Sequence, residues 1–289
     1  MNRILITGAT GNVGLEVIKA LLEAPTPFQI QAGVRTLDQG NDKLKGYDLQ
    51  LVLFDFTDVA TYQPALAQCD VLFLLRPPQI SDVEKYFRPL IETAQAVGLP
   101  HIVFLSVQGV EKSSIIPHHK IEKLIVASLI PYTFLRPAYF MQNFSTTLRD
   151  DLVNKNRVFL PAGQASFTLI DVADIGQVAA KILTNTADYA NQAFDLTCNE
   201  RLNFGEMAEK LSQGLGRPIR YESPNLLHFY LTKRKEKVPP MLILVMIMLH
   251  YLPRFQTVPP MTQSVQQITG KAARSFEQFI AANKTLLRK

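Results

Sequence analysis

The chain has 289 residues, of which 47% are hydrophobic and 19% charged, so its length and composition suit one large α/β domain with or without an appended lobe. A formal net charge of +5 suits an anionic small-molecule ligand, but the basic residues are too dispersed to indicate direct nucleic-acid binding. Two distant cysteines predict neither a disulfide framework nor a metal site, and the N-terminus lacks the pattern of a secretory signal. We therefore expect a cytoplasmic protein that binds a small-molecule substrate.

Apolar runs and helical patterns alternate along the first half of the chain. Six strands are expected at 3–7, 28–35, 49–55, 70–75, 101–107 and 131–137. Helices are expected between them, including 15–24 and one that begins after Ser81 and ends at Gly98. This alternation predicts a Rossmann-type α/β fold, a doubly wound parallel sheet whose ligands bind at the carboxyl ends of the strands.

The second half is less regular and contains three clear helical patterns, at 171–183, 203–216 and 275–287. Asn203 and Glu206 have the spacing of a capping box at the start of the second of these helices. We interpret the chain as a single Rossmann-type domain, residues 1–289, with its core at about 1–145 and 171–186. A smaller C-terminal substrate-binding lobe is expected from about 146–170 and 187–289.

The most apolar segment is MLILVMIML, Met241–Leu249. It is far shorter than the roughly 20 residues that span a bilayer, so no membrane span is expected. A buried or pocket-lining helix is our prediction, and the surface of a homodimer or a helix at a membrane surface are the alternatives. The basic cluster KRKEK, Lys233–Lys237, lies just before this segment and is expected to be solvated surface.

A glycine turn comes directly after the first predicted strand. The stretch TGATGNVG spaces Gly8, Gly11 and Gly14 three residues apart, between a strand and a helix. In that context glycines form a tight turn, let the backbone approach a pyrophosphate and bring helix and strand close together. The helix N-terminus then offers free N–H groups and a partial positive charge to the phosphates.

The end of the second predicted strand distinguishes between the two nicotinamide cofactors. An NAD site would place an acidic residue there, whereas this chain has Arg35. A guanidinium suits a 2′-phosphate through its charge and its bidentate geometry. We therefore expect NADP(H), with NAD(H) as the alternative because Asp38 lies nearby.

Several of these motifs carry a family resemblance that extends over nearly the whole chain. The stretches TGATGNVG, LSVQGV, LRPAYFMQNF, DVADIGQVAAKIL and ITGKAARSFEQFIAAN resemble the NmrA-like atypical short-chain dehydrogenase/reductases. That family includes NADPH-dependent quinone oxidoreductases, azoreductase-like proteins, ergot-alkaloid reductases and regulators that bind the cofactor without catalysis. The resemblance implies a cofactor site at the following residues: Gly8, Thr10, Gly11, Asn12, Val13 and Gly14 at the pyrophosphate, Arg35 at the 2′-phosphate, Asp55 and Phe56 at the adenine, Leu75, Arg76 and Pro77 along the ribose or nicotinamide, Ser106 and Val107 near the nicotinamide, and Pro137, Tyr139, Phe140 and Asn143 over it.

The catalytic pair of a standard short-chain dehydrogenase, a Tyr with a Lys four residues later, is missing. The corresponding helix has PHHKIEKL, in which His119 and Lys123 stand four residues apart, as do His118 and Glu122. We expect His118 to donate a proton, with His119 as the second candidate and Glu122 as the group that orients the ring. The alternative is that both histidines are surface residues at a helix start.

These observations leave two main hypotheses for function. One is an NADPH-dependent oxidoreductase that transfers hydride to a small apolar conjugated acceptor such as a quinone. The other is a non-catalytic NADP(H)-binding redox sensor that acts through a protein partner. A nucleotide-sugar epimerase or dehydratase is disfavoured by the missing Tyr–Lys pair. Apolar and aromatic residues are expected to line the acceptor pocket or to form the core: Tyr139, Phe140, Met141, Phe144, Phe167, Phe229 and Tyr230.

Overall fold

The computed structural model describes residues 3–24 and 28–288, which form two compact units. Unit 1 comprises the described residues up to Pro137 together with Val172–Leu196 and Ser264–Lys271. Unit 2 comprises Ala138–Asp171, Thr197–Gln263 and the described residues from Ala272 onward. The predicted substrate lobe overlaps unit 2 over most of its length. It includes 187–196 and Ser264–Lys271, which belong to unit 1, and lacks 138–145 and Asp171, which belong to unit 2.

Unit 1 is built on a seven-stranded sheet in the order β10-β6-β5-β4-β1-β2-β3, in which every described pairing is parallel. The predicted doubly wound α/β fold and its six strands are thereby confirmed. A seventh strand, β10, was not predicted, because its short sequence QAFDL has only one buried residue and lacks the continuous apolar run of the central strands. The strands are β1 (Arg3–Ile6), β2 (Gln29–Val34), β3 (Gln50–Leu53), β4 (Val71–Leu75), β5 (His101–Leu105), β6 (Tyr132–Pro137) and β10 (Gln192–Leu196).

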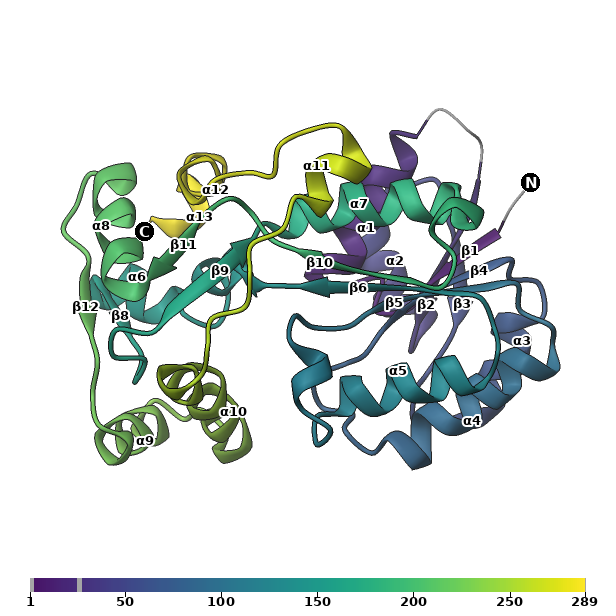
Figure 1. Ribbon diagram of the computed structural model, residues 1–289, viewed down its shortest axis with the longest axis horizontal. Helices are drawn as coiled ribbons and strands as arrows, with labels where there is room; N and C mark the ends of the chain where they lie inside the picture. The colour runs from purple at the N-terminus through teal and green to yellow at the C-terminus, as the bar shows by residue number, and fades with distance from the viewer. Residues whose placement is uncertain (1–2, 25–27, 289) are drawn as a thin grey trace. The chain divides into compact units, whose positions relative to one another are not determined.

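Helices cover both faces of this sheet, as a parallel sheet requires. Figure 1 shows α1 and α7 on one face and α4 and α5 on the other. Between the sheet and α4 and α5 lies a cluster that includes the fully buried Leu72, Phe87 and Phe104. The helices of unit 1 are α1 (Asn12–Leu22), α2 (Leu37–Leu44), α3 (Tyr62–Leu66), α4 (Val83–Ala96), α5 (Pro117–Ala127), α7 (Val172–Thr184) and α11 (Ser264–Thr269).

Helix α4 begins one residue later than the sequence suggested. Its N-cap is Asp82, not Ser81, and the Asp82 carboxylate accepts a hydrogen bond from the Lys85 N–H. A carboxylate at this position also has a favourable interaction with the helix dipole. Gly98 follows the helix with a φ of +70°, so the predicted end of α4 is confirmed.

The strand order reverses between β1 and β4, where Thr7 joins the two strand ends. The Thr7 N–H donates to the carbonyl of Phe73 at 3.0 Å, and the Leu75 N–H donates to the Thr7 hydroxyl at 2.8 Å. The side chain of Thr7 is fully buried. The carboxyl ends of the two central strands are therefore fixed side by side at the point where doubly wound sheets bind their ligands.

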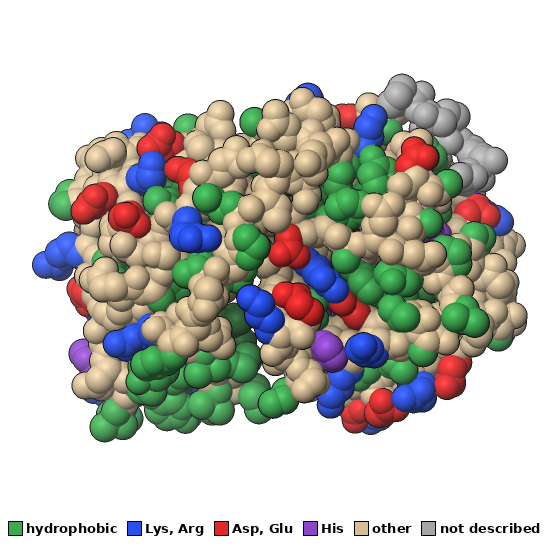
Figure 2. All heavy atoms as spheres, viewed as in Figure 1, with side chains coloured by type: hydrophobic (Ala, Val, Ile, Leu, Met, Phe, Trp, Pro, Cys, Tyr) green, Lys and Arg blue, Asp and Glu red, His purple; other side chains and the backbone are tan. Residues whose placement is uncertain are grey.

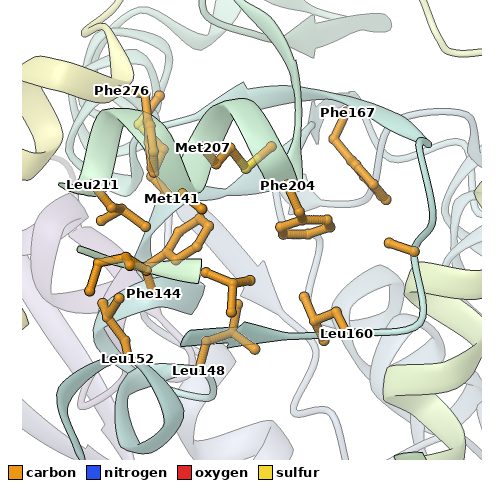
Figure 3. Packing of buried hydrophobic residues seen from close by; sticks show 14 of the residues in the cluster. Met141, Phe144, Leu148, Leu152, Leu160, Phe167, Phe204, Met207, Leu211 and Phe276 are labelled. Atoms are coloured by element: carbon orange, nitrogen blue, oxygen red, sulfur yellow. The ribbon is translucent and has the colours of Figure 1, made fainter. Parts of the chain in front are cut away.

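Unit 2 contains a three-stranded sheet, β11-β9-β7, and a two-stranded sheet, β12-β8, with helices packed around them. Figure 3 shows side chains of α8, of 141–152 and of α12 packed together, including Phe144, Phe204 and Phe276. The strands are β7 (Tyr139–Phe140), β8 (Arg157–Phe159), β9 (Ser166–Ile170), β11 (Arg201–Asn203) and β12 (Arg220–Glu222). The helices are α6 (Arg149–Lys155), α8 (Phe204–Leu215), α9 (Leu226–Lys235), α10 (Pro240–Tyr251), α12 (Phe276–Ala282) and α13 (Lys284–Leu287).

Local signals account for the ends of two of these helices. The predicted capping box of Asn203 and Glu206 is present at the start of α8. The predicted C-terminal helix is interrupted at Asn283, which separates α12 from α13. Asn is a poor helix former because its side chain bonds to the backbone, and the Asn283 amide donates to the carbonyl of Phe279 at 2.9 Å.

Asp151 is the centre of a buried ion cluster in unit 2. Its carboxylate contacts Lys233 on α9, Arg157 on β8 at 3.0 Å and Lys155 at 3.2 Å. Burial alone would raise the pKa of Asp151, but the hydrogen bonds from Lys233 and Arg157 and the charges of Lys233 and Lys155 hold it below its ordinary value. Lys233 is only 5% exposed, so the prediction that the basic cluster is wholly solvated surface is wrong at this residue.

We expect Asp151→Asn to destabilise the protein, because it leaves the buried Lys233 without its main counter-charge. The free energy of unfolding, measured by urea denaturation, should fall by about 3 kcal/mol. Asp150→Asn is the matched control, since the neighbouring Asp150 side chain is 70% exposed and its loss should cost less than about 1 kcal/mol. Equal effects of the two substitutions would contradict the structural role of the cluster.

Candidate cofactor and proton-transfer site

The glycine turn places the first helix directly against the end of β1. Gly8 adopts a φ of +62°, a conformation that L side chains rarely take, and the Gly11 N–H donates to the carbonyl of Gly8 at 2.9 Å. A Cβ atom at Gly14 would lie 2.4 Å from the Gly8 carbonyl oxygen, so a larger residue has no room there. The close approach aims the N-terminus of α1 over the strand ends.

The first turn of α1 has no negatively charged side chain that would repel an anion. Its N-cap, Gly11, has no side chain to accept from the helix N–H groups, and the first turn carries no acidic residue. The Asn12 side chain is exposed, whereas Val13 is buried in the core, which leaves its backbone as the part that a ligand could contact. N–H groups and the helix dipole therefore make this turn suitable for a phosphate.

Arg35 follows β2 at the same edge of the sheet. Its side chain is exposed, and it forms no ion pair with any residue that the structure describes. Asp55, after β3, accepts from the N–H and the hydroxyl of Thr57, both at 2.8 Å. Phe56 is 5% exposed, its ring packs on that of Phe87, and its carbonyl accepts a hydrogen bond from the Tyr62 hydroxyl at 2.9 Å, so Phe56 belongs to the core.

Arg76 organises the loop after β4. Its guanidinium donates to the backbone carbonyls of Pro77 at 3.0 Å, Pro78 at 3.2 Å and Ile80 at 2.7 Å. Its Nε also donates to Nε2 of His118 at 3.4 Å. Burial lowers the pKa of Arg76, yet a guanidinium stays protonated, so a fixed positive charge lies beside the imidazole.

The electrostatics around His118 disfavour an imidazolium. Burial and the charge of Arg76 lower the pKa of His118 from 6.5 to about 3. Because Nε2 accepts from Arg76, the ring proton of the neutral imidazole is at Nδ1. The predicted role of His118 as a proton donor is thus limited to that N–H and remains a prediction.

Glu122 does not orient His118, so that part of the sequence hypothesis is wrong. Both of its carboxylate oxygens accept from Arg136 of β6, at 3.0 and 2.7 Å. Glu122 is 8% exposed, and a buried carboxylate requires such a partner. His119 instead has Nδ1 at 3.1 Å from the carbonyl of Val110, and Lys123 points outward with an exposed side chain.

Ser106 comes directly after β5 and has an unsatisfied hydroxyl. The residue is 2% exposed, and no described group lies within hydrogen-bond distance of its Oγ. Its N–H donates to the carbonyl of Leu135 at 2.7 Å, which holds it at the end of the strand. A buried hydroxyl without a partner is costly, and a ligand bound at this edge would supply one. The neighbouring Val107 is half-buried, and Pro137 is buried at the end of β6.

The remaining candidates, Tyr139, Phe140 and Asn143, belong to unit 2. The Tyr139 hydroxyl lies 3.0 Å from Nε2 of His250, whose Nδ1 lies 2.6 Å from the carbonyl of Met246. Burial raises the pKa of Tyr139 and lowers that of His250 to about 4, so both groups are neutral at pH 7. Sequence reasoning missed His250, although its position in an otherwise apolar helix was a usable signal.

The apolar candidates divide between core and surface. Met141, Phe144 and Phe229 are fully buried in the core of unit 2, and Phe167 is 8% exposed. Tyr139, Phe140 and Tyr230 are only partly buried and retain accessible ring surface. Among the predicted apolar residues, only these three can therefore line a pocket.

Three features of unit 1 are suited to binding a dinucleotide. The close approach at Gly14, the helix N-terminus without a carboxylate and the unsatisfied Ser106 hydroxyl all lie at the carboxyl edge of the sheet. Within residues 3–24 and 28–288, no three His, Cys, Asp or Glu side chains are grouped to hold a metal ion. Both cysteines are buried and reduced, and burial raises the pKa of Cys69 to about 12.

Comparisons with known proteins agree with this combination of fold and turn. Residues 1–267 match the model of the NmrA-like family, and the chain belongs to that family. It is 30% identical over 276 residues to prestalk A differentiation protein A of Dictyostelium discoideum, covering 96% of this chain and 90% of that protein. It is 29% identical over 287 residues to the NAD(P)H azoreductase of Xenophilus azovorans, covering 97% of each.

Solved structures share the fold. The NADPH complex of an NADPH-dependent quinone oxidoreductase from Escherichia coli superposes with a TM-score of 0.86 at 21% identity, covering 96% of this chain and 99% of that one. Over the described residues, no helix has the length and apolar character needed to cross a membrane.

We expect His118 to stay neutral well below pH 6. Because its pKa in the folded protein lies near 3 and its ordinary value is 6.5, folding stability should decline as the pH falls from about 6.5 toward 3. Long-range ¹H–¹⁵N NMR spectra should report a neutral, Nδ1-protonated ring at pH 5. In Arg76→Met the pKa should rise, since one of the two causes of its depression is gone. A wild-type ring that titrates near 6.5 would contradict the assignment.

Proposed function

We propose that this chain is an NADPH-dependent oxidoreductase that transfers hydride to a small, flat, conjugated acceptor such as a quinone. The observation that carries the proposal is the glycine turn at the reversal point of the sheet, where α1 approaches β1 without room for a Cβ at Gly14. An exposed guanidinium at Arg35, on the same edge, favours NADP(H) over NAD(H).

The named relatives support the same class of enzyme. An NAD(P)H azoreductase and a quinone oxidoreductase that is 25% identical over 224 residues support an NAD(P)H-dependent oxidoreductase. The NADPH complex of the structurally similar quinone oxidoreductase supports NADP(H) as the cofactor. Azo dyes and quinones are both planar conjugated molecules, so they define an acceptor class.

Several candidate residues of unit 1 then have a physical role in binding. The N–H groups of Asn12, Val13 and Gly14 are oriented for the pyrophosphate, and the Ser106 hydroxyl gains a hydrogen-bond partner. When bound, NADPH supplies the hydride, and with one proton from the medium a quinone becomes a hydroquinone. The loop held by Arg76 keeps a fixed positive charge near His118, which favours negative charge on an acceptor oxygen.

The absence of the Tyr–Lys pair fits such an acceptor. Reduction of an isolated carbonyl to an alcohol depends on a general acid that protonates the oxygen. A conjugated acceptor depends on it less, because it delocalises the negative charge that hydride brings. Orientation and an apolar environment are then the main requirements. In place of the missing Tyr, we assign His118 Nδ1–H as a hydrogen-bond donor to the acceptor oxygen, while the proton itself comes from the medium.

The proposal is tested by the loss of NADPH absorbance with a panel of quinones, azo dyes and enones. Turnover is expected with at least one planar acceptor and should be absent with simple ketones. Tight NADPH binding without turnover on any acceptor would overturn the oxidoreductase and support the NADP(H)-binding regulator instead. His118→Gln should lower kcat more than it raises KM, because the side chain is assigned to the chemical step.

Arg35→Asp should move the cofactor preference from NADPH toward NADH. Removal of a charged hydrogen-bond donor costs about 1.5–3 kcal/mol, so the ratio of kcat/KM for NADPH to that for NADH should fall at least about tenfold. Arg220→Asp, at an exposed arginine of unit 2, controls for the change in net charge. An unchanged ratio in Arg35→Asp would exclude a 2′-phosphate contact.

A further inference from the structure

Helix α10 exposes an apolar face that a water-facing helix ordinarily does not have. Of its residues only Ile243, Met246 and His250 are buried, so the prediction of a buried helix is wrong for the rest of α10. Figure 2 shows hydrophobic side chains gathered over α9 and α10. The exposed apolar face of α10 consists of Met241, Leu242, Leu244, Val245, Met248 and Leu249.

The spacing of these side chains makes one continuous stripe. Met241, Leu244, Val245 and Met248 follow the i, i+3, i+4, i+7 pattern of a single helix face, and Met241 is 72% exposed. A globular protein normally places polar residues on such a face. Leu227 and Leu231 of α9 are also exposed and extend the apolar area. Apolar surface of this extent marks an interaction site.

The charges beside this stripe have one sign. Within 223–263 the sequence has five basic residues and a single acidic one, Glu236. Glu236 is already paired with Lys155 and Lys233. The exposed charges at the end of α9 and in the turn to α10 are therefore Arg234, Lys235 and Lys237.

The aromatic residues at the end of α10 also suit a membrane–water interface. Tyr251 and Phe255 follow the stripe at the C-terminal end of α10, and Phe255 is 72% exposed. Aromatic rings at the edge of an apolar face are typical of membrane–water interfaces. The inner side of α10 is tied down by the hydrogen bond between His250 and Tyr139, so the stripe is presented on a fixed support.

We propose that this α9–α10 surface docks the protein on an anionic phospholipid bilayer, with α10 in the plane of the interface. The apolar stripe enters the boundary between headgroups and acyl chains, while Arg234, Lys235 and Lys237 contact the acidic headgroups. Helix α10 has 12 residues and is about 18 Å long at about 1.5 Å per residue, so it lies on a bilayer of about 30 Å and does not span it.

A second copy of the chain is a poorer occupant of this surface. A two-fold contact through the stripes would bring the basic side chains of both copies together, with no free acid on 223–263 to compensate them. An anionic bilayer supplies both the apolar layer and the opposite charge.

Vesicle flotation with phosphatidylcholine alone, or with phosphatidylglycerol added, tests the proposal. We expect binding to the anionic vesicles that weakens as salt is raised, because the headgroup contacts are screened. Changing Arg234, Lys235 and Lys237 to Gln should weaken it by roughly fivefold for each side chain removed. Leu244→Glu with Met248→Glu should weaken it by roughly tenfold for each residue.

The matched control for Leu244→Glu alone is Leu129→Glu, which adds the same single negative charge at an apolar residue of unit 1 that is 87% exposed, and should bind as the wild type does. Circular dichroism and thermal melting show whether each variant is folded. No flotation by the wild type, equal binding to neutral vesicles, or equal loss in Leu129→Glu would overturn the proposal. So would a dimer in sedimentation equilibrium that Leu244→Glu dissociates, which would assign the surface to a second copy.

Discussion

The contact between α1 and the end of β1 is the constraint on which the arrangement of unit 1 depends. Gly14 has no space for a side chain against the Gly8 carbonyl, and Gly8 itself needs a positive φ. Thr7, one residue earlier, holds the carboxyl ends of β1 and β4 together through its backbone and its hydroxyl. Strand pairing, helix packing and the anion-binding N–H groups are thus set by a few consecutive residues.

Three ionic groups below the surface have specific partners, which lie on other elements in two cases and in the same loop in the third. Asp151 joins α6, β8 and α9, and Glu122 joins α5 to β6. Arg76 forms no ion pair with a described acid but donates to three carbonyls of its own loop. Removal of an ion from water is expensive, so each such group fixes the elements that it connects. The loop after β4 and the N-terminus of α5 are consequently held in place before any ligand binds.

The fold was predictable from the sequence where the signals were local. The alternation of apolar strands and helices, the glycine turn and the capping box of Asn203 and Glu206 depend on neighbouring residues, and each is present in the structure. The pairing of Glu122 with Arg136, 14 residues away, could not be inferred, because a one-turn spacing to His118 was equally compatible with the pattern. Burial of Lys233 depends on Asp151, 82 residues away, and was hidden inside a basic cluster. The outward face of α10 was given only as an alternative, because uniform hydrophobicity does not tell which side of a helix is covered.

The placement of the two thiols has a chemical consequence for the proposed reduction of conjugated acceptors such as quinones. Such molecules are electrophiles that arylate thiolates by conjugate addition, and the thiolate is the reactive form. Cys69 is 6% exposed with a pKa raised to about 12, and Cys198 is fully buried. Neither sulfur presents an accessible nucleophile, so repeated encounters with the proposed substrates do not covalently inactivate the protein through cysteine.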